Sequence, residues 1–276
     1  MNIAVLSGKG GTGKTFVSVN LACAMKNSVY VDCDVEEPNG HLFFKPRGIK
    51  TEPVYVKLPQ IDKAKCNGCR KCVEFCKFNA LAFVKDTPIL FGGVCHSCGG
   101  CKMVCPRKAI SEKDYQIGEV RIGRHKNTSV ISGVMNTGEE SGVPIIRQLL
   151  GHINKIPTVI DCPPGSACSV MESVKNADYC IIVAEPTIFG RHNFEMVYEL
   201  IKILKKPVGV VLNKITDDKN LMEDFCIKND IAILKKIPYS SELAMDNAKG
   251  NIAYETSPMA KEIFDNLYQK VLEVVK

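Results

Sequence analysis

Short runs of consecutive apolar residues alternate with helical patterns along most of the chain. Ile3 to Leu6 and Val29 to Val31 read as buried strands, and the apolar side chains over 14–26 recur at helical spacing. Further strand-like runs lie at 158–160, 177–184, 208–212 and 231–237, with helical patterns over 190–205 and 217–229. Because buried strands that alternate with helices form parallel sheets, we predict an α/β fold whose mostly parallel sheet carries helices on both faces.

Residues 60–114 break this alternation, because they hold eight of the fourteen cysteines and no helical pattern of ordinary length. The residues that follow, 115–135, have the pattern of a β-hairpin that rejoins the main sheet. We therefore predict one domain built from 1–59 and 115–276, interrupted by a small cysteine-rich domain at 60–114.

The turn after the first predicted strand reads GKGGTGKT and fits the phosphate-binding pattern G-x-x-x-x-G-K-T. A strand precedes it and a helix follows, which is the setting where backbone N–H groups and a helix N-terminus hold phosphates. Lys14 is expected to reach the β and γ phosphates of ATP, and Thr15 to offer its hydroxyl to Mg²⁺. The predicted nucleotide-binding residues of this loop are Gly8, Gly10, Gly11, Thr12, Gly13, Lys14, Thr15 and Phe16.

A second lysine, Lys9, follows the first glycine of this loop, although the phosphate-binding pattern does not require it. The sequence K-G-G-x-G-K-T resembles the deviant Walker A loop of the MinD, ParA and nitrogenase iron-protein group of ATPases. The resemblance implies an ATP-dependent homodimer in which Lys9 reaches the nucleotide of the other subunit and acts in catalysis with Lys14. The alternative interpretation of Lys9 is a solvated loop lysine.

Two stretches resemble the switch segments of the same group. DCDVEEPN at 32–39 is similar to the first switch, which implies that Asp34 positions the attacking water and is catalytic. DCPPG at 161–165 is similar to the second switch, which implies that Asp161 serves the magnesium ion. Asp32 is interpreted either as a group that orients the magnesium shell or as a cap of the next element.

The adenine-binding parts of the group also have counterparts. Asn213 and Lys214 follow a predicted strand and match the position whose asparagine contacts adenine. The stretch IPYS contains Pro238 and fits the next strand end, whose backbone lines the base. The resemblance therefore implies base-binding roles for these three residues.

Eight cysteines form two runs of the same spacing, C-x₂-C-x₂-C-x₃-C. This is the spacing of bacterial two-cluster ferredoxins, in which the fourth cysteine of each run ligates the cluster of the other run. Zinc is the rival, but it prefers tetrahedral sites built from paired C-x-x-C knuckles. The predicted ligands are Cys66, Cys69, Cys72 and Cys105 for one [4Fe–4S] cluster, and Cys95, Cys98, Cys101 and Cys76 for the other.

Composition and charge refine this picture. Fourteen cysteines without a signal-peptide pattern favour metal ligation in the cytoplasm over disulfides. No apolar run reaches the roughly 18 residues of a membrane span, and the net charge of +6 is too small to predict nucleic-acid binding. Residues 62–115 hold ten Lys or Arg against five Asp or Glu, which favours docking to an acidic electron carrier or cofactor-assembly protein.

Two further cysteines, Cys162 and Cys168, flank the second switch. A metal site bridging two subunits is one interpretation of this pair. Burial or chance is the simpler one, because small apolar thiols are common in protein cores.

Over the full chain, these motifs resemble MinD-superfamily P-loop ATPases with an inserted ferredoxin domain. The resemblance implies ATP hydrolysis coupled to iron–sulfur chemistry, in metallocofactor or cluster assembly. One function is an ATPase whose nucleotide state gates electron transfer, and another is a carrier or scaffold that delivers clusters or a metallocofactor. A positioning ATPase like MinD is disfavoured, because 259–276 has the pattern of a helix that packs on the sheet, not of a membrane-binding helix.

Overall fold

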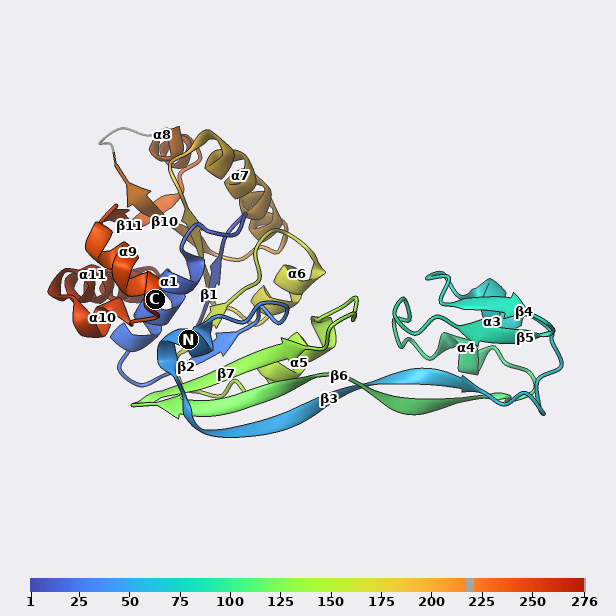
Figure 1. The fold of residues 1–276 in the computed structure, drawn as a ribbon. Helices are drawn as coiled ribbons and strands as arrows, with labels where there is room; N and C mark the ends of the chain where they lie inside the picture. Colours follow the sequence, from blue (N-terminus) through green and yellow to red (C-terminus); the bar gives the residue numbers. More distant parts are fainter. Residues whose placement is uncertain (217–220, 276) are drawn as a thin grey trace.

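The computed structural model describes residues 1–216 and 221–275, in which a two-stranded ribbon joins a large α/β body to a small module (Figure 1). A nine-stranded sheet forms the body, in the order β11-β10-β9-β1-β8-β2-β7-β6-β3. Its strands are β1 (Asn2–Leu6), β2 (Ser28–Asp32), β3 (Arg47–Ile61), β6 (Ile110–His125), β7 (Thr128–Met135), β8 (Thr158–Asp161), β9 (Tyr179–Ala184), β10 (Val208–Ile215) and β11 (Ala232–Pro238).

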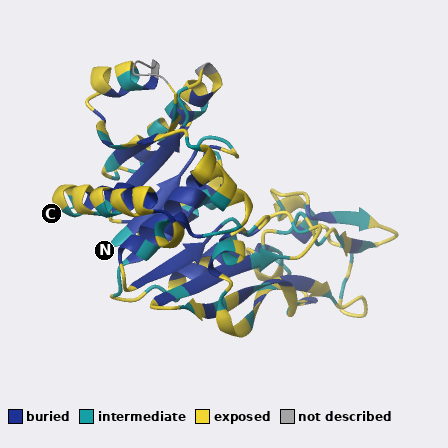
Figure 2. Ribbon diagram, turned by 60° about the vertical axis from the view of Figure 1, so that its left-hand side comes forward, coloured by how far each residue is buried: buried dark blue, intermediate teal, exposed yellow. Residues whose placement is uncertain are grey.

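The strands from β11 to β7 are parallel, and β6 and β3 add an antiparallel edge. One apolar core lies under α5 (Val143–Gly151), α6 (Cys168–Val174), α7 (Ile188–Ile203) and α8 (Leu221–Lys228). The other lies under α1 (Lys14–Ala24), α2 (Gly40–Phe44), α9 (Ser241–Ala248), α10 (Ala253–Thr256) and α11 (Pro258–Val274). Figure 2 shows the buried strands between helices whose outer sides are exposed. The predicted mostly parallel sheet with helices on both faces is confirmed.

The predicted strands of the body are present, with ends shifted by one to three residues. The helical patterns correspond to α1, α7, α8 and α11, although residues 217–220 of the predicted 217–229 helix lie outside the described residues. The predicted hairpin material at 115–135 forms the antiparallel pair β6 and β7. Within the described residues, no helix is both long and apolar enough to cross a membrane.

The sequence analysis missed β3, which pairs with β6 from Arg47↔Arg124 to Ile61↔Ile110. The inner half of β6 also pairs with β7, from Gly118 to His125, whereas its outer half pairs with β3 alone. A register shift separates the two halves, between Val54 and Tyr55 of β3. Such a bulge bends a strand pair. It lies where the outer halves of β3 and β6, which form the ribbon, leave the body.

The module occupies residues 62–109, at the outer end of the ribbon (Figure 1). Its elements are short: α3 (Lys71–Phe75), the hairpin of β4 (Leu81–Val84) and β5 (Thr87–Leu90), and α4 (Gly100–Met103). Its buried apolar cluster is limited to Cys72, Leu81 and Ile110, with a few partly buried neighbours. The predicted domain boundaries at 59/60 and 114/115 fall inside β3 and β6, so the ribbon joins the two regions.

Candidate functional site

The glycine-rich loop follows β1 at the carboxyl edge of the sheet, where open α/β sheets bind ligands. Gly11 and Gly13 have φ values of 81° and 90°, in the left-handed region that favours glycine. A Cβ on Gly13 would lie 2.2 Å from Nδ2 of Asn213, and one on Gly8 would lie 2.2 Å from the carbonyl oxygen of Asn193. The loop therefore needs glycine both for its turns and for its close packing.

Lys14 and Asp161 form a buried ion pair beneath this loop, with Nζ and Oδ1 2.5 Å apart. The hydroxyl of Tyr30 donates to Asp161 Oδ2 at 2.8 Å, and the hydroxyl of Ser18 lies 3.0 Å from Oδ1. Burial alone would lower the pKa of Lys14, but the attraction of Asp161 outweighs it and raises that pKa. The predicted magnesium ligand is thus held by the predicted phosphate lysine.

Asp32 lies beside Asp161, because the two residues are register partners at the ends of β2 and β8. It accepts hydrogen bonds from the backbone N–H groups of Gly40, at 2.9 Å, and Asp34, at 3.2 Å. Burial and the neighbouring Asp161 raise the pKa of Asp32 to about 7. These bonds match the interpretation of Asp32 as a cap, since its carboxylate fixes the backbone of the first switch.

Asp34 itself is part-buried, and burial raises its pKa against the opposing effect of Lys14. The charges of Lys14 and Asp161 both act on this carboxyl group, which places it in the same electrostatic cluster. The structure therefore brings together the lysine and the two switch aspartates, from segments far apart in the sequence.

A cavity of about 350 Å³ opens beside the loop. Its lining includes six predicted nucleotide-binding residues: Gly11, Gly13, Phe16, Asn213, Lys214 and Pro238. Asn213 Nδ2 donates to the carbonyl oxygen of Thr12 at 2.8 Å, which ties the cavity to the loop. The Thr12 hydroxyl is buried and has no hydrogen-bond partner among the described residues. The position of the cavity beside the loop fits a nucleotide at the predicted place.

The exposed face of the loop carries Lys9, whose side chain is 36% exposed. Its Nζ lies 3.3 Å from Oε2 of Glu185, a residue that the sequence analysis did not single out. Lys214 also contacts Glu185, and its Nζ donates to the carbonyl oxygen of Gly11 at 2.7 Å. Lys214, like Asn213, is therefore a predicted adenine-binding residue that also bonds the backbone of the phosphate loop.

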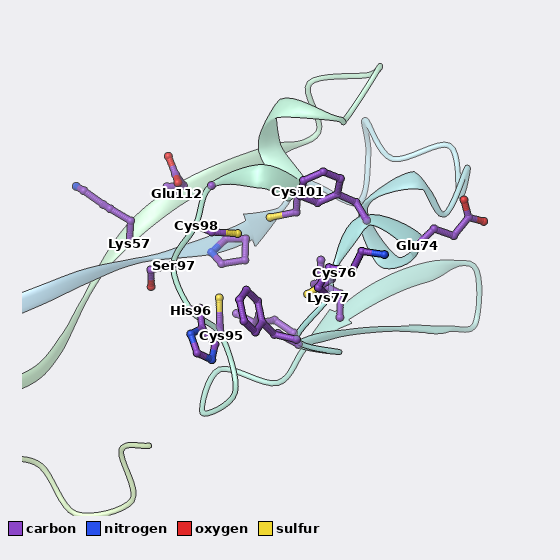
Figure 3. Close-up of a pocket in the computed structure, with 17 residues that line it drawn as sticks. Lys57, Glu74, Cys76, Lys77, Cys95, His96, Ser97, Cys98, Cys101 and Glu112 are labelled. Carbon is purple, nitrogen blue, oxygen red and sulfur yellow. The ribbon is translucent and has the colours of Figure 1, made fainter. Parts of the chain in front are cut away.

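The eight cysteines of the module line two cavities, and each cavity takes three thiols from one run and the fourth from the other. Cys76, Cys95, Cys98 and Cys101 line one cavity, and Cys66, Cys69, Cys72 and Cys105 line the second. Figure 3 shows the sulfur atoms of the first set gathered around a common space. All eight thiols are free, and burial raises the pKa of Cys101 to about 11.

Among the residues that the structure describes, no three Cys, His, Asp or Glu side chains converge closely enough to hold a single metal ion. The donor chemistry of the two cysteine sets suits a larger group, since four thiols line each cavity, although the cavity volumes differ, at about 540 Å³ for the first set and about 20 Å³ for the second. Cys162 is fully buried in the body core, and Cys168 is exposed at the start of α6. The simpler interpretation, burial, therefore describes Cys162.

The fold and the loop define a P-loop nucleotide-binding protein of the α/β class. Residues 3–252 match the family described as the CobQ/CobB/MinD/ParA nucleotide binding domain. Because the match covers most of the chain, the protein belongs to this family.

Individual proteins and solved structures are also similar to this chain. The uncharacterized protein MJ0578 of Methanocaldococcus jannaschii is 29% identical over 282 residues, which cover 100% of this chain and 98% of the relative. The cell division ATPase MinD of Pyrococcus furiosus has a similar structure, with a TM-score of 0.61 at 18% identity over 99% of this chain and 98% of its own. MinD of Pyrococcus horikoshii, solved with Mg-ADP, has a TM-score of 0.60 at 18% identity over 99% and 96% of the two chains. At these identities, the two MinD structures show a shared fold.

Proposed function

We propose that this protein is a dimeric, Mg²⁺-dependent ATPase whose nucleotide state gates electron transfer through two [4Fe–4S] clusters in the module. The observation that carries the proposal is the pairing of two sites in one chain. One is a P-loop with a switch aspartate beneath it, and the other is a pair of four-thiol cavities at the end of the ribbon. The cellular role proposed for this coupling is metallocofactor or iron–sulfur cluster assembly.

Nucleotide binding exchanges partners within the P-loop site. The triphosphate competes for the Lys14 ammonium that now pairs with Asp161, and release of Lys14 frees the Asp161 carboxylate for the Mg²⁺ shell. Thr15 supplies its hydroxyl to the same ion, and Asp34 orients the attacking water. The buried ion pair therefore keeps the carboxylate neutralised until nucleotide and magnesium arrive together.

Crossed ligation of the clusters is supported by the lining of the two cavities. The fourth cysteine of each run, Cys76 or Cys105, lies with the first three cysteines of the other run. A [4Fe–4S] group bound there supplies one-electron redox chemistry. The thiols of this chain hold it in place, and the backbone and apolar surroundings set its exposure to water.

Gating is supported by backbone hydrogen bonds that join the first switch to the ribbon. Met135 N donates to the carbonyl oxygen of Val35 at 2.9 Å, and Asn136 N donates to that of Ile117 at 2.9 Å. Further out, the Tyr115 hydroxyl donates to Glu139 at 2.9 Å. A γ-phosphate that moves the first switch therefore pulls on β7 and on the base of the ribbon.

The partner in this proposal is an acidic electron carrier or cofactor-assembly protein. The excess of Lys and Arg in the module attracts such a partner at long range. Delivery of a cluster or metallocofactor is the second candidate function. The exposure of Cys69 and Cys98 favours it, because an acceptor can reach those ligand positions.

The two functions differ in whether iron leaves the protein. Anaerobic preparation should give about eight iron atoms and eight acid-labile sulfides per chain. We expect the wild-type protein to keep both clusters through many ATP turnovers in the presence of an apo-acceptor. Loss of iron to the acceptor in step with hydrolysis would instead establish delivery, and a preparation that binds no iron would refute both.

A further inference from the structure

Glu185 contacts two lysines of the nucleotide site, Lys9 and Lys214. It follows β9 directly, and β9 pairs with β1 up to Leu6↔Ile182, so Glu185 lies beside the loop that β1 enters. Its carboxylate contacts Lys9 Nζ at 3.3 Å and accepts a hydrogen bond from Lys214 Nζ. Lys214 also donates to the carbonyl oxygen of Gly11. A single carboxylate therefore contacts a lysine of the phosphate loop, Lys9, and a second lysine that bonds the backbone of the same loop.

The environment of Glu185 keeps this carboxylate charged and fixed in place. The side chain is 14% exposed, whereas the side chains of Lys9 and Lys214 are 36% and 44% exposed. Burial would raise the pKa of Glu185, but the two lysines overcome this effect and lower it. The backbone is held as well, because Thr187 N donates to the Glu185 carbonyl oxygen at 2.8 Å.

We propose that Glu185 is a positioning residue that keeps Lys9 on its own subunit until two chains close on ATP. This inference rests on the proposed role of Lys9 across the dimer interface. In this proposal, reaching a phosphate of the other subunit takes the Lys9 ammonium away from its own Glu185. Closure therefore exchanges the carboxylate for the triphosphate, and Lys214 remains to neutralise Glu185 when Lys9 leaves.

An interaction present only in the open state opposes closure. Each dimer breaks two Lys9–Glu185 pairs, one in each subunit. From the usual strength of partly exposed ion pairs, their removal should tighten the ATP-bound dimer by about two- to thirty-fold. The predicted direction of the effect is unusual for a residue at a nucleotide site, because removal of its charge strengthens ATP-dependent dimerisation.

The test is the dimer dissociation constant, measured by sedimentation with Mg²⁺ and a non-hydrolysable ATP analogue. Glu185→Gln, which keeps the shape and removes the charge, should lower this constant by about two- to thirty-fold. Glu195→Gln is the matched control, because it removes a carboxylate that pairs only locally with Arg191 on α7. The control should dimerise like the wild type.

Glu185→Asp keeps the charge but shortens the reach, so it should shift the constant less and in the same direction. It also preserves the test if Glu185→Gln folds poorly. A Glu185→Gln dimer no tighter than the wild type would overturn the inference. Lys9→Ala separates the two proposals: normal dimerisation refutes the role of Lys9 and the inference with it. A monomeric Lys9→Ala beside an unchanged Glu185→Gln refutes the inference alone.

Discussion

Asp161 lies at the centre of the P-loop site, since an ammonium and two hydroxyl groups surround its carboxylate. Two buried aspartates, Asp32 and Asp161, stand side by side, and Lys14 is the cation that compensates them. The same lysine is the predicted phosphate ligand. Stability and nucleotide binding therefore depend on one side chain, and the two effects can be separated by substitution.

Lys14→Ala should abolish nucleotide binding and also lower the free energy of unfolding. Loss of one partner of a buried ion pair costs about 3–5 kcal/mol, because the other charge stays buried. Calorimetric titration with ATP and urea denaturation measure the two effects. The double variant Lys14→Ala/Asp161→Asn should regain much of the stability and still fail to bind. Wild-type stability in the single variant would contradict the role given to the ion pair.

Asp34→Ala should retain ATP but hydrolyse it about a hundredfold more slowly, because this carboxylate aligns water and does not hold the nucleotide. Equilibrium binding of a fluorescent ATP analogue and phosphate release measure the two properties. Asp230→Asn, at an exposed position whose left-handed backbone asparagine also tolerates, is the control and should behave like the wild type. Undiminished hydrolysis in the Asp34 variant would remove this residue from catalysis.

At the residue scale, the motifs located the loop and switches, but not the groups that hold them. Tyr30 precedes Asp32 by two positions and so shares its strand face, a signal that was present in the sequence. Glu185 gave no such signal, since its contact with Lys9 joins segments that meet only through β1–β9 pairing. Contacts between distant segments require the strand order, which the sequence alone did not provide.

At the scale of elements, the ribbon of β3 and β6 determines where the module lies. It was missed because most positions of β3 are exposed, so no buried face imposed a strong alternation. Pro53 and Pro59 also weakened the strand pattern, although an edge strand tolerates proline. The crossed grouping of the two cysteine runs, in contrast, was predicted from the match of their spacing to that of bacterial two-cluster ferredoxins.

Cys76→Ala should damage the cluster whose other ligands lie in the second run, and not the cluster of its own sequence neighbours. Iron analysis and electron paramagnetic resonance of the reduced protein measure which signal is lost. Cys105→Ala is the reciprocal control and should remove the other signal. If both variants lose the signal of their own run, the crossed ligation is wrong.

At the scale of the whole molecule, the chain combines a P-loop body with a cysteine-rich module at the outer end of a ribbon (Figure 1). The first switch is bonded to β7, and β7 is bonded to the base of that ribbon. Closure of two bodies on ATP would therefore reposition two modules. A nucleotide can shift this arrangement only to the extent that one position binds it better than the other.

Lys9→Ala should keep nucleotide affinity within a fewfold of the wild type, because Lys14 and the backbone loop remain. It should lose ATP-dependent dimerisation and most hydrolysis, since the second subunit no longer receives its lysine. Light scattering after gel filtration, with Mg²⁺ and a non-hydrolysable analogue, measures the mass. A Lys9 variant that still dimerises would contradict the role across the interface.

The most direct test of gating is the reduction potential of each cluster, measured by anaerobic titration without nucleotide, with ADP and with a non-hydrolysable ATP analogue. The account predicts that at least one potential changes when the analogue closes the dimer. Lys9→Ala should keep its nucleotide-free potentials in the presence of the analogue, because it cannot close. Identical potentials for the wild type in all three states would contradict the gating of electron transfer by nucleotide and leave cluster delivery as the better function.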